Sequence, residues 1–509
     1  MNPIIATFVC ACGVAGLFYL DRDKTVRTSR ALWIPVLWVM IVSSRSVSEW
    51  FGLLPKYAAG SESDGLDAVI YGLLTLLAIG VIAKRRKRVE TLLFANWAIL
   101  LYFFFCLISV SWSSDPGTSL KRWIKAIGDL AMVLVILTDR RPALALERLI
   151  ARVGYVLLPA SVLLIKYYGQ FGHDYTPDGI QMNTGVSTNK NMLGVMLLVV
   201  SLYTLWRWIG IWRAKDRPDR RRRLIAQGVL LLFGLLLFRL ANSVTSLACF
   251  ALGGSFVLAT NHHWFKARPV RIHLLAMGLL LAGGLAILIG AQGSLIHAVG
   301  RQSNLSGRTE IWAAAIKAAP NPLIGAGYED FWISPYAKNF SAQLVGWWHP
   351  EGLNEAHNGY IEVYLNLGCV GVGLIALILV TGYRRAVKAF RRNTRIGGLF
   401  LSYIIVAAVY SFSEAGFRML DAIWIFLLLS VAGSSGVLIG IFNDKARGTT
   451  GARVSKTNKI PLNKVPDPLP QPVYAGPGGA GLMASRPKQF ATTRSGANGT
   501  EFVQGSISE

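Results

Sequence analysis

The chain has 509 residues, of which 53% are hydrophobic, and its 52 Lys and Arg residues outnumber 27 Asp and Glu residues. The apolar residues come in long blocks, which excludes an ordinary soluble globular protein and predicts an all-α integral membrane protein. A formal charge of +25 would favour nucleic acid as a partner for a soluble protein. Here the basic residues lie in short segments between apolar blocks, where such charge sets membrane topology, so we expect no nucleic-acid partner.

A spanning helix needs about 20 largely apolar residues, and roughly thirteen stretches come close to this length. We therefore predict 12–13 transmembrane helices. Their approximate spans are residues 3–20, 31–50, 66–83, 91–110, 120–138, 149–168, 191–212, 224–239, 242–260, 272–291, 360–382, 397–414 and 421–442. The first stretch has no preceding basic region and no evident small-residue cleavage site, so we interpret it as a spanning helix and not as a signal sequence.

Alternate loops are rich in Lys and Arg, for example "KRRKR" and "RAKDRPDRRRR", and the loops between them are poor in both. The basic loops should face the cytoplasm, which places the N-terminus outside and the C-terminus inside. Residues 1–442 would form the membrane domain. Residues 443–509 are rich in Gly, Pro, Ser and Thr and predict a disordered cytoplasmic tail.

The longest loop inside the predicted membrane domain, residues 292–358, falls on the outer side. A long loop in a compact domain is often functional. Within it, "TEIWAAAIKAA" has a helical pattern in which Ile311, Ala315 and Ile316 would share one apolar face.

The same loop contains "SGRTEIW" and "NPLIGAGYEDFW", and it leads into "HNGYIEVYLNLGCVGVG". In their order and spacing these segments resemble the O-antigen ligase and O-antigen polymerase family of bacterial membrane glycosyltransferases, most closely its exopolysaccharide production branch. The resemblance covers residues 301–379. Weaker matches are "SVSWSSDPGTSLKRW", "STNKNMLG" and "SFSEAGFRMLDAIW".

This resemblance implies a fold like that of other lipid-dependent glycosyltransferases, in the bacterial inner membrane with a periplasmic active site. It implies transfer or polymerisation of a glycan carried on a polyprenyl diphosphate, by a metal-independent inverting reaction without a cofactor. The acceptor would be a hydroxyl of a glycan, a lipid or a protein. Membrane lipid and other polysaccharide assembly proteins are further expected partners.

His357 is the candidate catalytic base, because an imidazole titrates near neutral pH and can take a proton from an attacking hydroxyl. Its place matches the functional histidine of the family. The alternative is a histidine that only caps the helix that follows.

Arg308 is the first candidate for binding the diphosphate, because a guanidinium at a helix N-terminus can hold phosphate oxygens together with backbone N–H groups. The alternative is a surface arginine paired with Glu310, which we also consider as an orienting residue. Arg301 is a weaker candidate.

Many relatives carry a second arginine where this chain has Val244. Basic residues that break the positive-inside pattern are the substitutes to consider, and snorkelling to lipid phosphates is the competing explanation for each. The candidates are Arg122, Lys190 and Arg239.

Asn358, Glu362 and Asn366 recur every four residues and predict a polar stripe that faces the bundle interior. Glu362 would orient His357 or accept a hydrogen bond from a sugar, or simply favour the helix N-terminus. Glu414 is a further candidate in an outer loop, where it is also spaced to pair with Arg418.

The main alternative function is a lipid-linked oligosaccharide flippase or polysaccharide transporter. Such proteins more often show two related halves and ionisable residues near the membrane midplane. The sequence has no clear internal repeat, and its five cysteines lie in predicted spans without metal-ligand spacing.

Overall fold

A computed structural model describes residues 2–22, 28–53, 65–175, 179–214, 218–267, 270–291, 306–337 and 355–442, without the side chains of 266–267, 283–291 and 306–310. All of them belong to one compact unit, Met1–Gly451. Residues 292–305 and 338–354 of the predicted outer loop, and the predicted cytoplasmic tail, lie outside the described residues, so these two assignments stay predictions.

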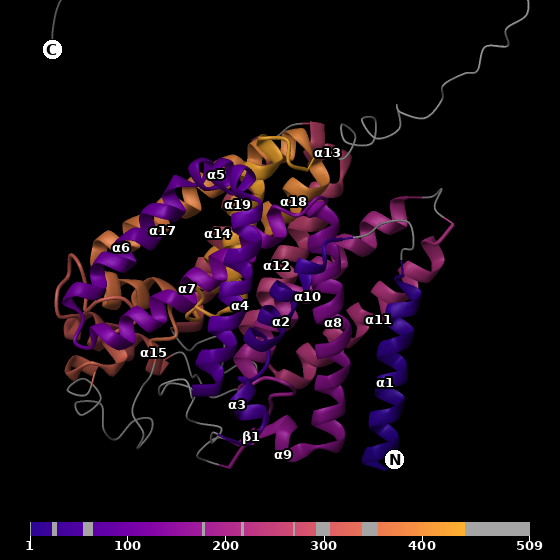
Figure 1. The fold of residues 1–509 in the computed structure, drawn as a ribbon, viewed down its shortest axis with the longest axis horizontal. Helices are drawn as coiled ribbons and strands as arrows, with labels where there is room; N and C mark the ends of the chain where they lie inside the picture. The colour runs from indigo at the N-terminus through magenta and orange to yellow at the C-terminus, as the bar shows by residue number, and fades with distance from the viewer. Residues whose placement is uncertain are drawn as a thin grey trace, which may run out of the picture. The chain divides into compact units, whose positions relative to one another are not determined.

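The described chain is almost entirely helical (Figure 1). Its first half contains α1 (Pro3–Leu20), the 3₁₀ turn η1 (Arg30–Leu32), α2 (Trp33–Val42), α3 (Val47–Trp50), α4 (Gly65–Lys84), α5 (Arg86–Ala95), α6 (Trp97–Ser109), η2 (Val110–Trp112), α7 (Pro116–Leu137), α8 (Pro142–Tyr167) and α9 (Gly169–Gly172). A two-stranded antiparallel ribbon follows, formed by β1 (His173–Tyr175) and β2 (Gln181–Asn183).

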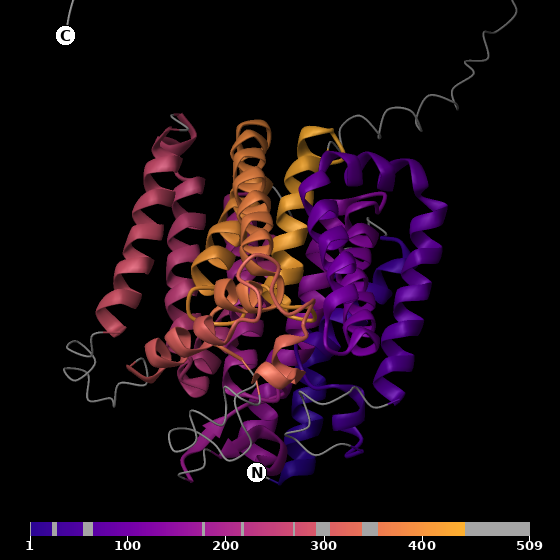
Figure 2. The same ribbon diagram turned by 90° about the vertical axis from the view of Figure 1, so that its left-hand side faces the viewer.

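The second half contains α10 (Lys190–Arg213), α11 (Arg220–Ala241), α12 (Val244–Asn261), α13 (His263–Ala267), α14 (Val270–Ala291), α15 (Ser306–Ala318), η4 (Phe331–Ile333), α17 (Gly359–Arg392), α18 (Thr394–Tyr410) and α19 (Ala422–Leu438). In Figure 2, the orange and yellow helices α17 to α19 lie between α12 and α14 on one side and the purple N-terminal helices on the other.

The predicted all-α membrane fold is confirmed. Within the described residues, seven helices are long and apolar enough to cross a membrane, or eight if α5 and α6, which are bent by 88°, are one span. Four shorter apolar helices of 10–17 residues and the more polar α7 account for the other predicted spans. Each predicted span thus overlaps a helix, although fewer of these helices are long enough alone to cross a bilayer.

A break inside α17 shapes the functional end of the bundle. Gly368 leaves helical geometry there, with φ 62° and ψ −164°. The break frees backbone groups that need partners in a membrane protein, and the segment 319–337 supplies them. Cys369 N donates to Pro322 O at 2.9 Å, and Gly327 N donates to Asn366 O at 2.8 Å.

Two more backbone hydrogen bonds, Val370 N to Leu323 O and Ala326 N to Leu365 O, complete the contact. The two backbones approach so closely that a Cβ on Gly368 would lie 2.2 Å from the carbonyl carbon of Leu323. Glycine is therefore required at this position for both conformation and space.

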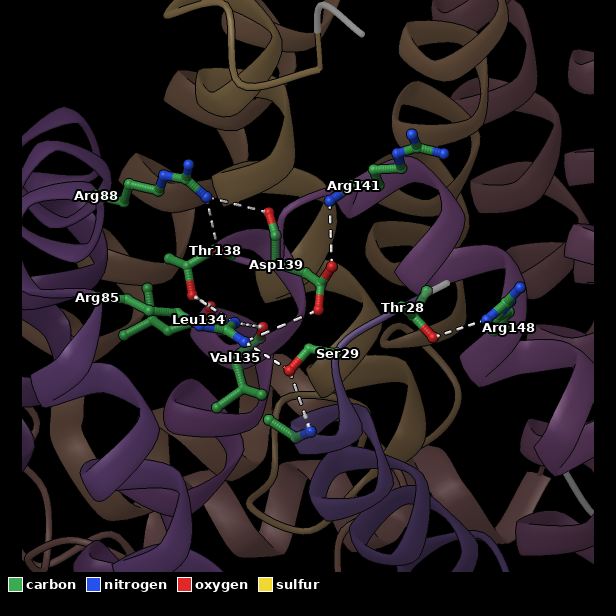
Figure 3. A network of polar contacts seen from close by, with 11 residues as sticks. Thr28, Ser29, Arg85, Arg88, Leu134, Val135, Thr138, Asp139, Arg141 and Arg148 are labelled. Carbon is green, nitrogen blue, oxygen red and sulfur yellow. Dashed lines mark hydrogen bonds and ion pairs between the residues drawn. The ribbon is translucent and has the colours of Figure 1, made fainter. Parts of the chain in front are cut away.

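The opposite end of the bundle is held by arginines (Figure 3). Arg85 donates to the carbonyl of Val135 at 3.0 Å and to the hydroxyl of Ser29 at 3.1 Å. Arg88 donates to the carbonyls of Thr138 and Asp139. These contacts satisfy carbonyls at the C-terminal end of α7, where cations are favoured by the helix dipole. Arginines of the "KRRKR" segment thus stabilise the C-terminal end of α7. Asp115, the N-cap residue of α7, lies at the other end of this helix.

We predict that Gly368→Ala destabilises the protein while Gly373→Ala, in the same helix, does not. The first substitution combines a left-handed backbone, which costs about 1–2 kcal/mol for other residues, with the clash against Leu323. A Cβ on Gly373 meets nothing within 4 Å. Thermal melting of the detergent-solubilised variants, followed by size-exclusion chromatography, measures the difference. Equal melting temperatures for the two variants would contradict the proposed role of the break.

Candidate functional site

His357 lies directly before α17 in a left-handed backbone conformation, with φ 51°. Such a conformation is uncommon for a residue with a side chain and often marks a functional position. Glu329 and Leu420 share it, with φ 54° and 56°. These three residues belong to three separate segments that meet at the N-terminal end of α17, so unusual backbone is concentrated there.

Two carboxylates face the same nitrogen of the His357 ring. Nδ1 lies 2.7 Å from Glu355 Oε1 and 3.5 Å from Glu414 Oε2. Since both neighbours are acceptors, Nδ1 carries a hydrogen and Nε2 is the atom that can exchange a proton with a substrate. The His357 side chain keeps 31% of its surface exposed, whereas that of Glu414 keeps 8%.

This environment changes the proton affinity of His357. Burial alone lowers the pKa, but the hydrogen bonds and negative charges of Glu355 and Glu414 outweigh it and raise the pKa from 6.5 to about 10. The imidazole is therefore positively charged at neutral pH. Its two carboxylates stabilise the protonated ring, as they would after it had accepted a proton.

Asn358 and Gly359 fasten the start of α17 to the segment 411–421. Asn358 Oδ1 accepts from the backbone N–H of Tyr360 at 3.0 Å, which caps the helix, and Nδ2 donates to Phe412 O at 3.0 Å. Gly359 N donates to the carbonyls of Ser411 and Glu414. These contacts of the two residues that follow His357 bring His357 and Glu414 together.

Glu362 and Asn366 face inward from α17, and this part of the predicted polar stripe is buried. Glu362 accepts from the indole of Trp332 at 2.7 Å and from the backbone N–H of Ala356. Asn366 accepts from Phe331 N at 3.0 Å. Glu362 therefore positions the segment that carries His357, whereas the groups that contact the imidazole itself are Glu355 and Glu414.

The helix α15 closes the site from another side. Trp312 donates to Ala356 O at 2.9 Å, and Ile311 and Ala315 are buried against α17 as expected. Ile316 is 46% exposed, so it is not packed against α17 as Ile311 and Ala315 are. Arg308 and Glu310 lie in the first turns of α15, and their side chains are outside the described part of the chain.

Further charges extend the site away from His357. Arg418 Nε lies 3.4 Å from Glu329 Oε2, and Arg418 NH1 lies 3.7 Å from Glu355 Oε2. Arg122, from α7, donates to the backbone carbonyl of Glu329. Arg418 therefore contacts Glu329 and Glu355, and not Glu414 as its sequence spacing suggested.

The other basic candidates differ in their distance from this network. Lys190 begins α10, next to Asn191, whose amide donates to Glu414 Oε2 at 3.2 Å. Arg239 is exposed in the last turn of α11, and Val244 is 57% exposed at the start of α12. Arg301 lies outside the described residues. Arg122 and Lys190 are thus at or beside the site, and no described contact links Arg239 to it.

Glu355, His357 and Glu414 also form a donor set whose ligand atoms lie within 4.8 Å of one another. Carboxylate and imidazole atoms can hold a divalent cation. In this structure the His357 ring faces both carboxylates through Nδ1, at 2.7 Å and 3.5 Å. Our expectation of a metal-independent reaction stays a prediction.

Four residues of the network were not among the sequence candidates for a role at the site: Asn191, Glu329, Glu355 and Arg418. Asn191, Glu329 and Arg418 lie in segments named in the sequence analysis, "STNKNMLG", "NPLIGAGYEDFW" and "SFSEAGFRMLDAIW". Glu355 lies two residues before His357, within the region 301–379 that carries the resemblance. The available signal was the short charged motifs in these segments. The partners of the four residues could not be predicted, because their contacts join segments far apart in the chain.

Comparison with known proteins identifies a similar family and one similar protein. Residues 228–376 match the O-antigen ligase family. The chain is also 26% identical over 313 residues to the exopolysaccharide production protein ExoQ of Rhizobium meliloti (strain 1021), a match that covers 59% of this chain and 68% of the relative. The resemblance inferred from the sequence is therefore confirmed, and the chain is a multi-pass membrane protein similar to this family.

We predict that His357 stays protonated well above neutral pH and that Glu355→Gln or Glu414→Gln lowers its midpoint. Neutral imidazole reacts with diethyl pyrocarbonate, so labelling at increasing pH, read by mass spectrometry of the His357 peptide, reports the titration. The same peptide in the unfolded chain should titrate near 6.5. Because folding raises this pKa, the ion pairs stabilise the fold fully below about pH 6.5, and the effect disappears as the pH passes about 10. A titration midpoint near 6.5 for His357 in the folded protein would contradict the stabilisation of its protonated ring by the two carboxylates.

Proposed function

We propose that this protein transfers or polymerises a glycan from a polyprenyl diphosphate onto an acceptor hydroxyl, at the periplasmic face of the bacterial inner membrane. The observation that carries the proposal is His357 held by Glu355 and Glu414 at the N-terminal end of α17. Similarity to the O-antigen ligase family supports the lipid-linked donor. Similarity to an exopolysaccharide production protein favours exopolysaccharide as the product.

In this proposal His357 Nε2 accepts the proton of the acceptor hydroxyl as its oxygen attacks the first sugar carbon. The carboxylates of Glu355 and Glu414 hold Nδ1–H, fix the ring and stabilise the imidazolium that forms. The bond between that carbon and the diphosphate oxygen breaks, and the diphosphate leaves with the prenyl carrier. The energy comes from the diphosphate linkage, so no nucleotide is needed.

Positive charge near the leaving diphosphate is the second requirement of the reaction. Arg122 is placed to meet it, since it lies in the same network as His357. Arg308 is proposed as a partner because it lies in the first turn of α15, which packs on α17. Lys190 is a lesser candidate beside Asn191.

The location of the charged network favours this proposal over a flippase. Its residues come from helix ends and connecting segments, namely the start of α7, α10 and α17 and the segments 325–330 and 411–421. A carrier that moves a lipid head group across the bilayer is expected to place ionisable residues near the midplane. The charges of this network sit instead at one end of the bundle.

We predict that His357→Ala abolishes polymer or glycoconjugate production in a deletion strain, while lipid-linked donor accumulates on the periplasmic side. His262→Ala serves as the matched control, because His262 is an exposed histidine beside α13 and outside the site. Membrane abundance is matched by immunoblot. Loss of long polymer with retained single-unit conjugates indicates a polymerase, and loss of all conjugates indicates a ligase. Full activity of His357→Ala, or donor stranded on the cytoplasmic side in the deletion strain, would refute the proposal.

We also predict an alkaline rise in the transfer rate. Only the neutral imidazole can accept a proton, so with a pKa of about 10 the initial rate should increase with pH, by up to about tenfold per unit. Glu355→Gln should move this rise to lower pH. Purified protein in nanodiscs with isolated lipid-linked donor provides the assay, and donor stability at each pH is the control. A rate that falls as His357 loses its proton would assign His357 an electrostatic role instead.

A further inference from the structure

Arg122 and Arg418 form a pair of cations that share one residue. Arg122 donates to the backbone carbonyl of Glu329, and Arg418 faces its carboxylate at 3.4 Å. Both guanidinium groups therefore lie against the same residue, Glu329. Two like charges there need an anion between or beside them, and Glu329 provides it.

The contacts of Arg418 are those of a cation that can change partners. Charge-assisted hydrogen bonds are typically about 2.7–2.9 Å long, whereas Arg418 lies 3.4 Å from Glu329 and 3.7 Å from Glu355. Its side chain is 35% exposed. A guanidinium offers five N–H donors in a planar fork, which suits two oxygens of one phosphate group better than one oxygen from each of two carboxylates.

The backbone of Glu329 is held in place by its neighbours. Its φ of 54° is unfavourable for a residue with a Cβ. Asp330 is anchored through its carboxylate to the backbone N–H of Ser114 at 2.8 Å, and Tyr328 is buried. Both neighbours of Glu329 are therefore fixed, which keeps the carbonyl that binds Arg122 in place.

A small cavity borders Glu329 and Arg418. Its other lining residues include Tyr102, Tyr328 and Phe417. Displacement of the Glu329 carboxylate from Arg418 would leave the contacts of His357 with Glu355 and Glu414 in place. Arg418 would stay linked to His357 through Glu355.

We propose that Glu329 is an internal counter-ion that keeps Arg122 and Arg418 ready for a diphosphate and gives up its place when the diphosphate binds. Arg418 then supplies the second guanidinium that the sequence lacks at Val244. This inference rests on the proposed function for the identity of the anion. It assigns Arg418 a binding role and Glu329 a gating role.

Binding of inorganic pyrophosphate to the full-length protein in nanodiscs, measured by calorimetry at constant ionic strength, tests the proposal. Glu329→Gln should bind pyrophosphate about tenfold more tightly than wild type, because the internal competitor has lost its charge. Arg418→Ala should bind at least tenfold more weakly, with Arg418→Lys in between. Inorganic phosphate should bind at least tenfold more weakly than pyrophosphate, which distinguishes a diphosphate site from a general phosphate site.

Two controls keep the result interpretable. Arg86→Ala removes an exposed arginine from α5, paired only locally with Glu90, and should leave pyrophosphate binding unchanged. Glu329→Asn is a second neutral variant, and asparagine tolerates positive φ. It should reproduce the effect of Glu329→Gln, so the test can still be read if one of the two variants is destabilised. Melting temperatures of all variants are measured in parallel.

Unchanged or weaker pyrophosphate binding by both folded Glu329 variants would overturn the counter-ion role, and unchanged binding by Arg418→Ala would overturn the role of Arg418. The binding assay involves no glycan transfer, so its outcome is independent of the His357→Ala experiment. Expected binding changes without any transfer activity would refute the proposed function alone. Transfer that depends on His357, without the binding changes, would refute the counter-ion exchange alone.

Discussion

The broken backbone of α17 is the constraint on which the site depends. At Gly368 the helix gives up hydrogen bonds that a chain in lipid cannot leave unmade. The carbonyls of the first half accept from Ala326 and Gly327, and the N–H groups of the second half donate to Pro322 and Leu323. These backbone hydrogen bonds hold the segment 319–337 against α17. Glu329, two residues beyond Gly327, is placed by the same hydrogen bonds.

From these hydrogen bonds the charged residues can be traced outward. The first half of α17 carries Glu362 and Asn366, which bind the segments on either side, and its cap residue, Asn358, binds the segment 411–421. Each of these polar groups has a hydrogen-bond partner in another segment of the chain. His357 is therefore fixed by neighbours that are themselves fixed, which is what a proton-transfer group needs for a constant geometry.

The helices, and the loops that meet at the site, could be predicted from the sequence, because long apolar blocks and alternating basic loops are strong signals. It also identified His357, Asn358 and Glu414, which the structure places together. It could not pair Arg418 with Glu329 and Glu355, since spacing along a helix suggested Glu414 instead and the segment from Ser411 to Asp421 is not helical. Nor could it show the break at Gly368, because a glycine in an apolar helix is common in membrane proteins.

The balance of charge in the network bears on how such a site works. Three cations, Arg122, Arg418 and protonated His357, are matched by the carboxylates of Glu329, Glu355 and Glu414. Partly buried charges are costly unless paired, so this balance stabilises the site. In the proposed function a bound diphosphate would add negative charge and strengthen the hold on the His357 proton, and departure of the diphosphate with its carrier would reverse both effects. Anion binding and the proton affinity of His357 would therefore be coupled. Arg418 contacts Glu355, and Glu355 contacts His357.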